Sequence, residues 1–148
     1  MRLTSRLPFV KADAQTFFPG EDDGDFKMTL HALEEIQYDG IFAFKYSKRP
    51  DTKALALPDH VDEKVKSKRL DEVLKLQESI TYKKNKDLEG REIEVLVEGP
   101  SETDKSILTG RTGTNKIVNF PGDIELIGSL VRIKILHARH HSLVGEKV

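Results

Sequence analysis

The chain has 148 residues, of which 33% are charged and 37% hydrophobic, and its formal net charge is −1 at pH 7. This size and composition suit one ordinary globular domain or two small ones, and no apolar run approaches the ~18 residues of a membrane span. The absence of cysteine excludes disulfides, a thiol nucleophile and metal sites built on thiolates.

The N-terminal half predicts one strand–helix–strand unit. A first strand is expected from Phe9 to Phe18 and a second from Ile41 to Tyr46, a short aromatic run. Between them, the acidic residues of EDDGD (21–25) suit the positive end of a helix dipole, and Gly40 is expected to end that helix. Its apolar face has four residues at helical spacing: Phe26, Leu30, Leu33 and Ile36.

A second helix is predicted after a proline-marked loop. It should open near Asp59 or Asp62 and end at about Tyr82, with the polar stretch 83–90 as a hinge. The expected inner face has seven apolar residues: Val61, Val65, Leu70, Val73, Leu74, Leu76 and Ile80.

From Arg91 onward the apolar period changes from helical to two. Five short strands with turn signals between them are enough for a small barrel. They are expected at 92–99, 106–110, 116–120, 130–138 and 142–146. We therefore predict an α+β chain, with a βαβ unit plus helix in residues 1–82 and a five-stranded β-barrel in residues 83–148.

Four motifs in this order carry a family resemblance: FPGE, KYSKRP, LTGRT and VNFPG. The stretch from 12 to 148 resembles the end of the catalytic α/β-barrel of the radical S-adenosylmethionine (SAM) methylthiotransferases, followed by their TRAM domain. The tRNA branch, which methylthiolates isopentenyladenosine beside the anticodon, is more similar than the branch acting on a ribosomal protein. The first part would then be a partial α/β-barrel and the second an OB-like RNA-binding barrel.

The resemblance implies tRNA, through its anticodon stem-loop, as the partner. The cations in LTGRTGTNKIVNFPG (108–122) are either solvated surface charge or RNA contacts, and the resemblance favours RNA. The expected RNA-binding residues are Arg111, Asn115, Lys116, Lys105, Arg132 and Lys134. Residues 83–148 hold 11 Lys and Arg against 10 Asp and Glu, a net charge of +1, so binding by this chain alone should be weak.

The resemblance also implies two four-iron four-sulfur clusters and SAM, with Glu21 and Arg49 in contact with SAM. A cluster needs thiolates, so we expect no cofactor, no catalytic residue and no catalysis for this chain alone. His137, His140 and His141 have no acidic or thiol neighbour at ligand spacing, so we expect no metal site. The remaining partner would be the N-terminal, cysteine-bearing part of the enzyme, in the cytoplasm and away from membranes.

Three residues depart from the family pattern. Phe17 and Asp51 stand where the family has glycine, and Lys48 stands where it has proline. Two alternatives therefore stay open: a stand-alone RNA-binding module of the TRAM type, and an inert gene fragment.

Overall fold

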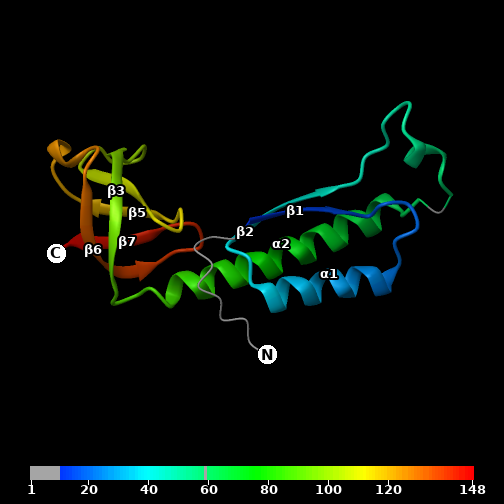
Figure 1. Cartoon of the computed structure of the whole chain (residues 1–148), viewed down its shortest axis with the longest axis horizontal. Helices are drawn as coiled ribbons and strands as arrows, with labels where there is room; N and C mark the ends of the chain where they lie inside the picture. The colour runs from blue at the N-terminus through cyan, green and yellow to red at the C-terminus, as the bar shows by residue number, and fades with distance from the viewer. Residues whose placement is uncertain (1–10, 59) are drawn as a thin grey trace. The chain divides into compact units, whose positions relative to one another are not determined.

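The computed structural model describes residues 11–58 and 60–148, and these divide into two compact units (Figure 1). The first unit ends at Ile80, and the second runs from Thr81 to Val148. Each unit has its own hydrophobic core. No helix in the part of the chain that the structure describes is long and apolar enough to cross a membrane.

The first unit is the predicted strand–helix–strand motif with a second helix. β1 and β2 pair in parallel, with Ala12 opposite Ile41. The elements are β1 (Lys11–Thr16), α1 (Asp23–Ile36), β2 (Gly40–Lys45), the 3-10 helix η1 (Lys53–Ala56) and α2 (Glu63–Lys86), which continues into the second unit.

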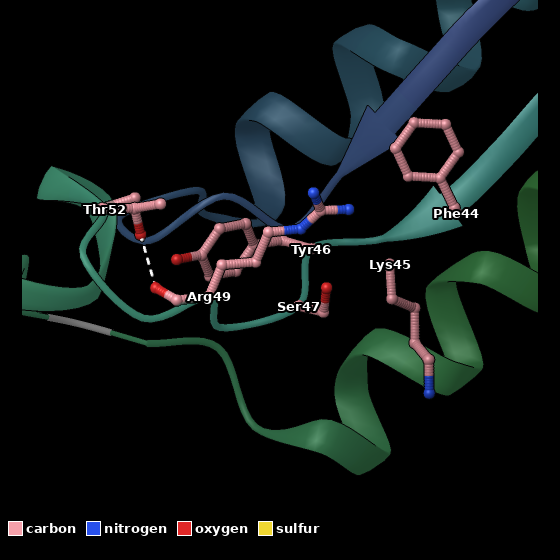
Figure 2. A pocket seen from close by; sticks show the side chains of 7 residues that line it. Phe44, Lys45, Tyr46, Ser47, Arg49 and Thr52 are labelled. Atoms are coloured by element: carbon pink, nitrogen blue, oxygen red, sulfur yellow. Dashed lines mark hydrogen bonds between the residues drawn. The ribbon is translucent and has the colours of Figure 1, made fainter.

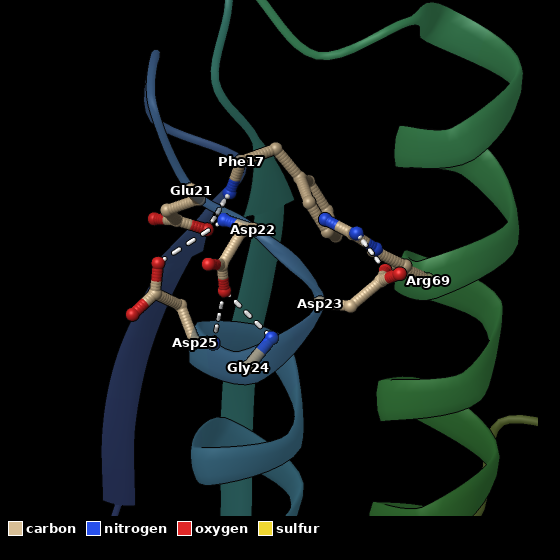
Figure 3. A network of polar contacts seen from close by, with 7 residues as sticks. All are labelled: Phe17, Glu21, Asp22, Asp23, Gly24, Asp25 and Arg69. Atoms are coloured by element: carbon tan, nitrogen blue, oxygen red, sulfur yellow. Dashed lines mark hydrogen bonds and ion pairs between the residues drawn. The ribbon is translucent and has the colours of Figure 1, made fainter.

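The acidic run begins α1 as predicted, with Asp22 as the N-cap. Asp22 Oδ1 accepts hydrogen bonds from the backbone N–H groups of Gly24 (2.6 Å) and Asp25 (3.0 Å) (Figure 3). Asp25 Oδ2 in turn accepts from the Asp22 N–H at 3.1 Å. This capping box satisfies N–H groups that a helix leaves unpaired. Asp23 also forms an ion pair with Arg69, which ties the start of α1 to α2.

The predicted end of the first helix is wrong. α1 ends at Ile36, because Gln37 adopts a left-handed conformation (φ 56°) and donates its N–H to the Leu33 carbonyl at 2.9 Å. Gly40 is instead the first residue of β2.

The first strand is shorter than predicted. β1 ends at Thr16, and Phe17 leaves the strand with φ 74°, which places its ring in the core at 1% exposure. The expected strand residues Phe9 and Val10 lie outside the described residues, as does Asp59, one of the two expected starts of the second helix.

The core of the first unit lies on one face of the two-stranded sheet. Ile41 and Ala43 of β2 pack against it, whereas Phe42 and Phe44 point to the opposite face and are 63% and 48% exposed. Five buried residues form this core: Phe17, Phe26, Leu33, Val73 and Ile80.

The predicted inner face of α2 is correct in part. Val73 and Ile80 are buried, but Val65 and Leu74 are largely exposed. Other buried positions of this helix carry polar side chains, namely Lys66, Arg69, Gln77 and Asn85. Lys66 is compensated by Glu63, whose carboxylate accepts its Nζ–H at 2.7 Å. This hydrogen bond holds the pKa of Glu63 below its ordinary value.

α2 also runs four residues beyond its predicted end. It continues through the expected hinge to Lys86, and the chain turns only at Gly90, which has φ 80°. The side chain of Asn85, in this last turn, is buried against the barrel. Tertiary contact therefore sustains a polar helical turn that has no apolar periodicity.

The second unit is a closed five-stranded barrel, as predicted. The strands are β3 (Glu92–Pro100), β4 (Ile107–Thr112), β5 (Ile117–Pro121), β6 (Leu130–Ala138) and β7 (Leu143–Lys147), in the order β3-β4-β5-β7-β6 (Figure 1). A short 3-10 helix, η2 (Ile124–Leu126), precedes β6. Inward residues alternate with outward ones along each strand. The core is Val95, Val97, Leu108, Val118, Phe120, Val131, Ile133, Ile135 and Leu143.

Candidate nucleic-acid interface

The strand order of the barrel defines a candidate binding face. Numbered within the barrel, the order β3-β4-β5-β7-β6 reads 1-2-3-5-4, with β5 and β7 parallel. Five-stranded OB barrels bind nucleic acid on strands 2 and 3, with the loops between strands 1 and 2 and between strands 4 and 5. Here these are β4, β5 and the loops 101–106 and 139–142.

Arg111 lies on the outer face of β4, beyond the predicted end of that strand at residue 110. β4 extends to Thr112, so Arg111 is a strand residue opposite Ile117 of β5 and Leu96 of β3. Its Nε donates to Glu98 at 3.2 Å and its Nη1 donates to Asn115 Oδ1 at 3.0 Å. The guanidinium is thus held in place but remains partly exposed.

The turn between β4 and β5 is short and is closed by hydrogen bonds. Asn115 adopts a left-handed conformation (φ 59°), and its N–H donates to the Thr112 carbonyl at 2.8 Å. Thr112 Oγ1 accepts the N–H of Lys116 at 3.1 Å. The Lys116 ammonium donates to Asn85 Oδ1 at 2.8 Å, so this cation is directed to α2 in the unbound protein.

The other expected cations lie on two further parts of the barrel. Lys105 is exposed in loop 101–106, next to β4. Arg132 and Lys134 point outward from β6, as alternation predicts, but β3 and β7 separate β6 from β4 and β5. Arg132 also lies 3.8 Å from the carboxylate of Glu92. The six expected residues therefore do not form one continuous patch.

Asn85 is a further polar residue beside the candidate face, and the sequence did not predict it. Its side chain is 3% exposed, and its Nδ2 donates to the carbonyls of Arg139 (3.1 Å) and His140 (3.3 Å) in loop 139–142. Tyr82 stacks on the His140 ring, with centroids 4.7 Å apart and planes at 18°. Asn85 follows Val73 by 12 residues, or about 3.3 helical turns, so the helical periodicity of the apolar residues gives no signal for it.

The two residues expected to contact SAM have different local surroundings. Glu21 Oε2 accepts the backbone N–H of Phe17 at 2.7 Å (Figure 3). Arg49 lines a hollow of about 350 Å³, where Thr52 Oγ1 donates to its carbonyl at 2.9 Å (Figure 2). Glu21 is not among the lining residues, which are Phe44, Lys45, Tyr46, Ser47, Arg49, Thr52 and Ala54.

The barrel matches a known domain family over residues 86–148, which is the last turn of α2 and all five strands. This stretch is a TRAM domain. The family resemblance expected from the motifs is confirmed for the barrel.

The resemblance extends beyond the TRAM domain. The chain is 47% identical over 137 residues to the tRNA-2-methylthio-N(6)-dimethylallyladenosine synthase of Syntrophus aciditrophicus, covering 93% of this chain and 30% of that protein. Proteins of the same name from Thermodesulfovibrio yellowstonii and Thermoanaerobacter sp. are 49% and 42% identical, over 93% and 99% of the chain and 31% and 32% of their own lengths. The chain is thus similar to the C-terminal region of these synthases and spans about a third of their length.

An iron–sulfur cluster, which the methylthiotransferase family implies, does not fit the residues of this chain. Such clusters are held by Cys thiolates, and the sequence has no cysteine. Among residues 11–58 and 60–148, no group of three or more His, Asp or Glu side chains could hold a metal ion.

Proposed function

We propose that this chain binds tRNA through its TRAM domain and acts as the substrate-binding portion of a tRNA methylthiotransferase. The observation that carries the proposal is the TRAM match on a barrel with OB strand order, because TRAM domains bind RNA. The relatives that match 93% of the chain are named for the modification of an adenosine in tRNA.

The contacts would come from β4 and the two flanking loops. Arg111 has a planar guanidinium that can meet a phosphate or stack on an unpaired base. Lys105 and Arg139 stand exposed in the loops on either side and suit the backbone phosphates. Asn115 would act by orienting Arg111. Arg132 and Lys134 would form a separate, weaker track on β6.

The RNA element would be the anticodon stem-loop, with the modified adenosine beside the anticodon. The names of the relatives specify a dimethylallyladenosine in tRNA, and the family resemblance of the motifs implies that this base lies beside the anticodon. A tRNA substrate in turn supports a cytoplasmic location.

A cysteine-bearing part of the same enzyme would supply the chemistry. This part would also cover the first unit. Within the described residues β1 and β2 form a sheet of only two strands, so each has an unpaired edge. Parallel sheets are normally covered on both faces, yet Phe42 and Phe44 are largely exposed. Missing strands of the α/β-barrel would pair with these edges and cover these rings.

Fluorescence anisotropy with a labelled tRNA anticodon stem-loop tests the proposal. We expect binding that weakens with salt, and Arg111→Ala should lower the log–log salt slope by about 1 if a phosphate contact is lost. Lys147→Ala, which removes an exposed cation from β7, is the matched control. Equal binding by the two variants would remove Arg111 from the interface, and no binding by the wild type would refute the function.

A further inference from the structure

We propose that Asn85 is a positioning residue of the RNA interface. From the last turn of α2 it would hold loop 139–142 and Lys116 in the arrangement that meets RNA. The inference rests on the proposed function, and it assigns a role in RNA binding to a residue that RNA cannot reach.

The Asn85 amide joins three segments of the second unit. Its Nδ2 donates to two consecutive loop carbonyls, those of Arg139 and His140, and its Oδ1 accepts from Lys116 beside the β4–β5 turn. An Asn side chain offers two donor hydrogens and one carbonyl acceptor. All three are engaged, in a residue that is 3% exposed.

Two neighbouring contacts reach the same loop from the same side. Tyr82, about one helical turn before Asn85, stacks on His140. Glu89, just after the helix, accepts the backbone N–H of Ala138 at 2.7 Å. Residues 82–89 thus contact three consecutive residues, Ala138 to His140, where β6 ends and the loop begins. A helix that was capped only by its own neighbours would not need these contacts.

The loop that Asn85 holds is a tight turn with an exposed cation. The Arg139 N–H donates to the Ser142 carbonyl at 2.8 Å, which closes the turn. The Arg139 side chain is exposed, and the part of the chain that the structure describes shows no ion pair for it. A loop fixed before binding loses less conformational freedom when it meets a ligand. Asn85 would therefore raise affinity through Arg139 without touching RNA.

A double-mutant cycle separates positioning from general stabilisation. We expect Asn85→Leu to weaken binding of the labelled stem-loop by about tenfold, and Arg139→Ala by a similar or smaller factor. If Asn85 acts through the loop, the double variant should be within about twofold of Asn85→Leu, because the two changes remove the same contact. If the two substitutions acted independently, their fold-losses in affinity would multiply in the double variant.

Gln77→Leu is the control for loss of a buried amide in the same helix. Gln77 is 6% exposed, and its Nε2 donates to the Tyr38 carbonyl at 2.8 Å in the first unit. We expect it to leave RNA affinity within about twofold of wild type, since its hydrogen bond to the Tyr38 carbonyl lies in the first unit.

Asn85→Asp keeps the test valid if the leucine variant does not fold. It retains an oxygen for Lys116 but turns a carboxylate oxygen towards the loop carbonyls, so the loop alone is released. We expect weaker binding that is again non-additive with Arg139→Ala. Wild-type affinity in the folded variant, or multiplying effects, would overturn the inference and leave the proposed function standing. Failure of the wild type to bind would overturn both.

Discussion

Arg111 and Glu98 form an ion pair across β3 and β4, with the Arg111 Nε 3.2 Å from the carboxylate. The central cation of the proposed interface is therefore partly neutralised before RNA arrives. Any phosphate that approaches Arg111 must share the guanidinium with Glu98 and lies close to its negative charge. Glu98 thus limits the affinity of the face that Arg111 serves.

Glu98→Gln should strengthen RNA binding. Exposed ion pairs contribute about 0.2–1 kcal/mol, so release of Arg111 and loss of one repulsive charge predict a gain of about threefold. Glu94→Gln is the control, since Glu94 lies on the same strand but opposite Arg132 on β6. Anisotropy titrations at two salt concentrations measure both. An equal gain from each substitution would mean that net charge alone matters.

Lys116→Met should destabilise the barrel, although Lys116 resembles an ordinary surface cation in the sequence. The substitution leaves the buried Asn85 Oδ1 without its hydrogen bond from Lys116, and an unsatisfied buried polar group costs about 1–3 kcal/mol. Lys105→Met, in an exposed loop, should change the free energy of unfolding by less than about 0.5 kcal/mol. Urea denaturation compares the two. Equal midpoints would show that the bond to Asn85 contributes nothing.

Glu89 should make the stability of the TRAM domain sensitive to acid. The Ala138 N–H, followed by Lys86, holds the pKa of Glu89 below its ordinary value of 4.5. The carboxylate therefore contributes stability that is present above pH 4.5 and is lost as the pH falls through the lowered folded-state pKa. Other acidic groups also titrate in this range, so the relevant quantity is the difference between wild type and Glu89→Gln.

That difference should be largest near neutral pH and should shrink below pH 4.5, because protonated Glu89 and glutamine are alike in charge. Glu125→Gln, at an exposed position in η2, serves as the control for the loss of a surface carboxylate. A gap between wild type and Glu89→Gln that stays constant down to low pH would contradict the role assigned to the Ala138 contact.

The barrel could be predicted from the sequence because each strand buries alternate residues. Val131, Ile133 and Ile135 are in the core, so Arg132 and Lys134 had to point outward. Each of the five predicted strands is present, with its ends shifted by at most two residues. Alternation is a local property, and a single stretch of sequence is enough to show it.

The arrangement around Asn85 could not be predicted in the same way. Its partners Lys116, Arg139 and His140 are 31 to 55 residues away, and all of them are polar. A periodic pattern of apolar residues contains no information about which amide meets which carbonyl across a fold. The same limit explains why Lys66, Arg69 and Gln77 were not expected on the buried face of α2.

The departures from the family pattern gain a physical meaning from the backbone. Phe17 and Asp51, the two residues that stand where the resemblance leads us to expect glycine, have φ values of 74° and 60°. Glycine adopts this left-handed region freely, whereas a side chain makes it costly. Phe17 offsets the cost by burying its ring in the core. Asp51 is exposed and gains nothing comparable.

Asp51→Gly should therefore stabilise the first unit, by about 0.5–1 kcal/mol, because relief of the left-handed strain exceeds the added freedom of glycine in the unfolded chain. Asp51→Ala is the control: it removes the same carboxylate but keeps a Cβ, and should give no gain. Phe17→Gly should lower stability by roughly 2–4 kcal/mol, since the lost aromatic burial outweighs the relaxed backbone. Native-state hydrogen exchange of the β2 amides reports on this unit without relying on global unfolding. If Asp51→Gly is only as stable as Asp51→Ala, the left-handed backbone at Asp51 costs little. The glycine expected at this position would then serve another purpose.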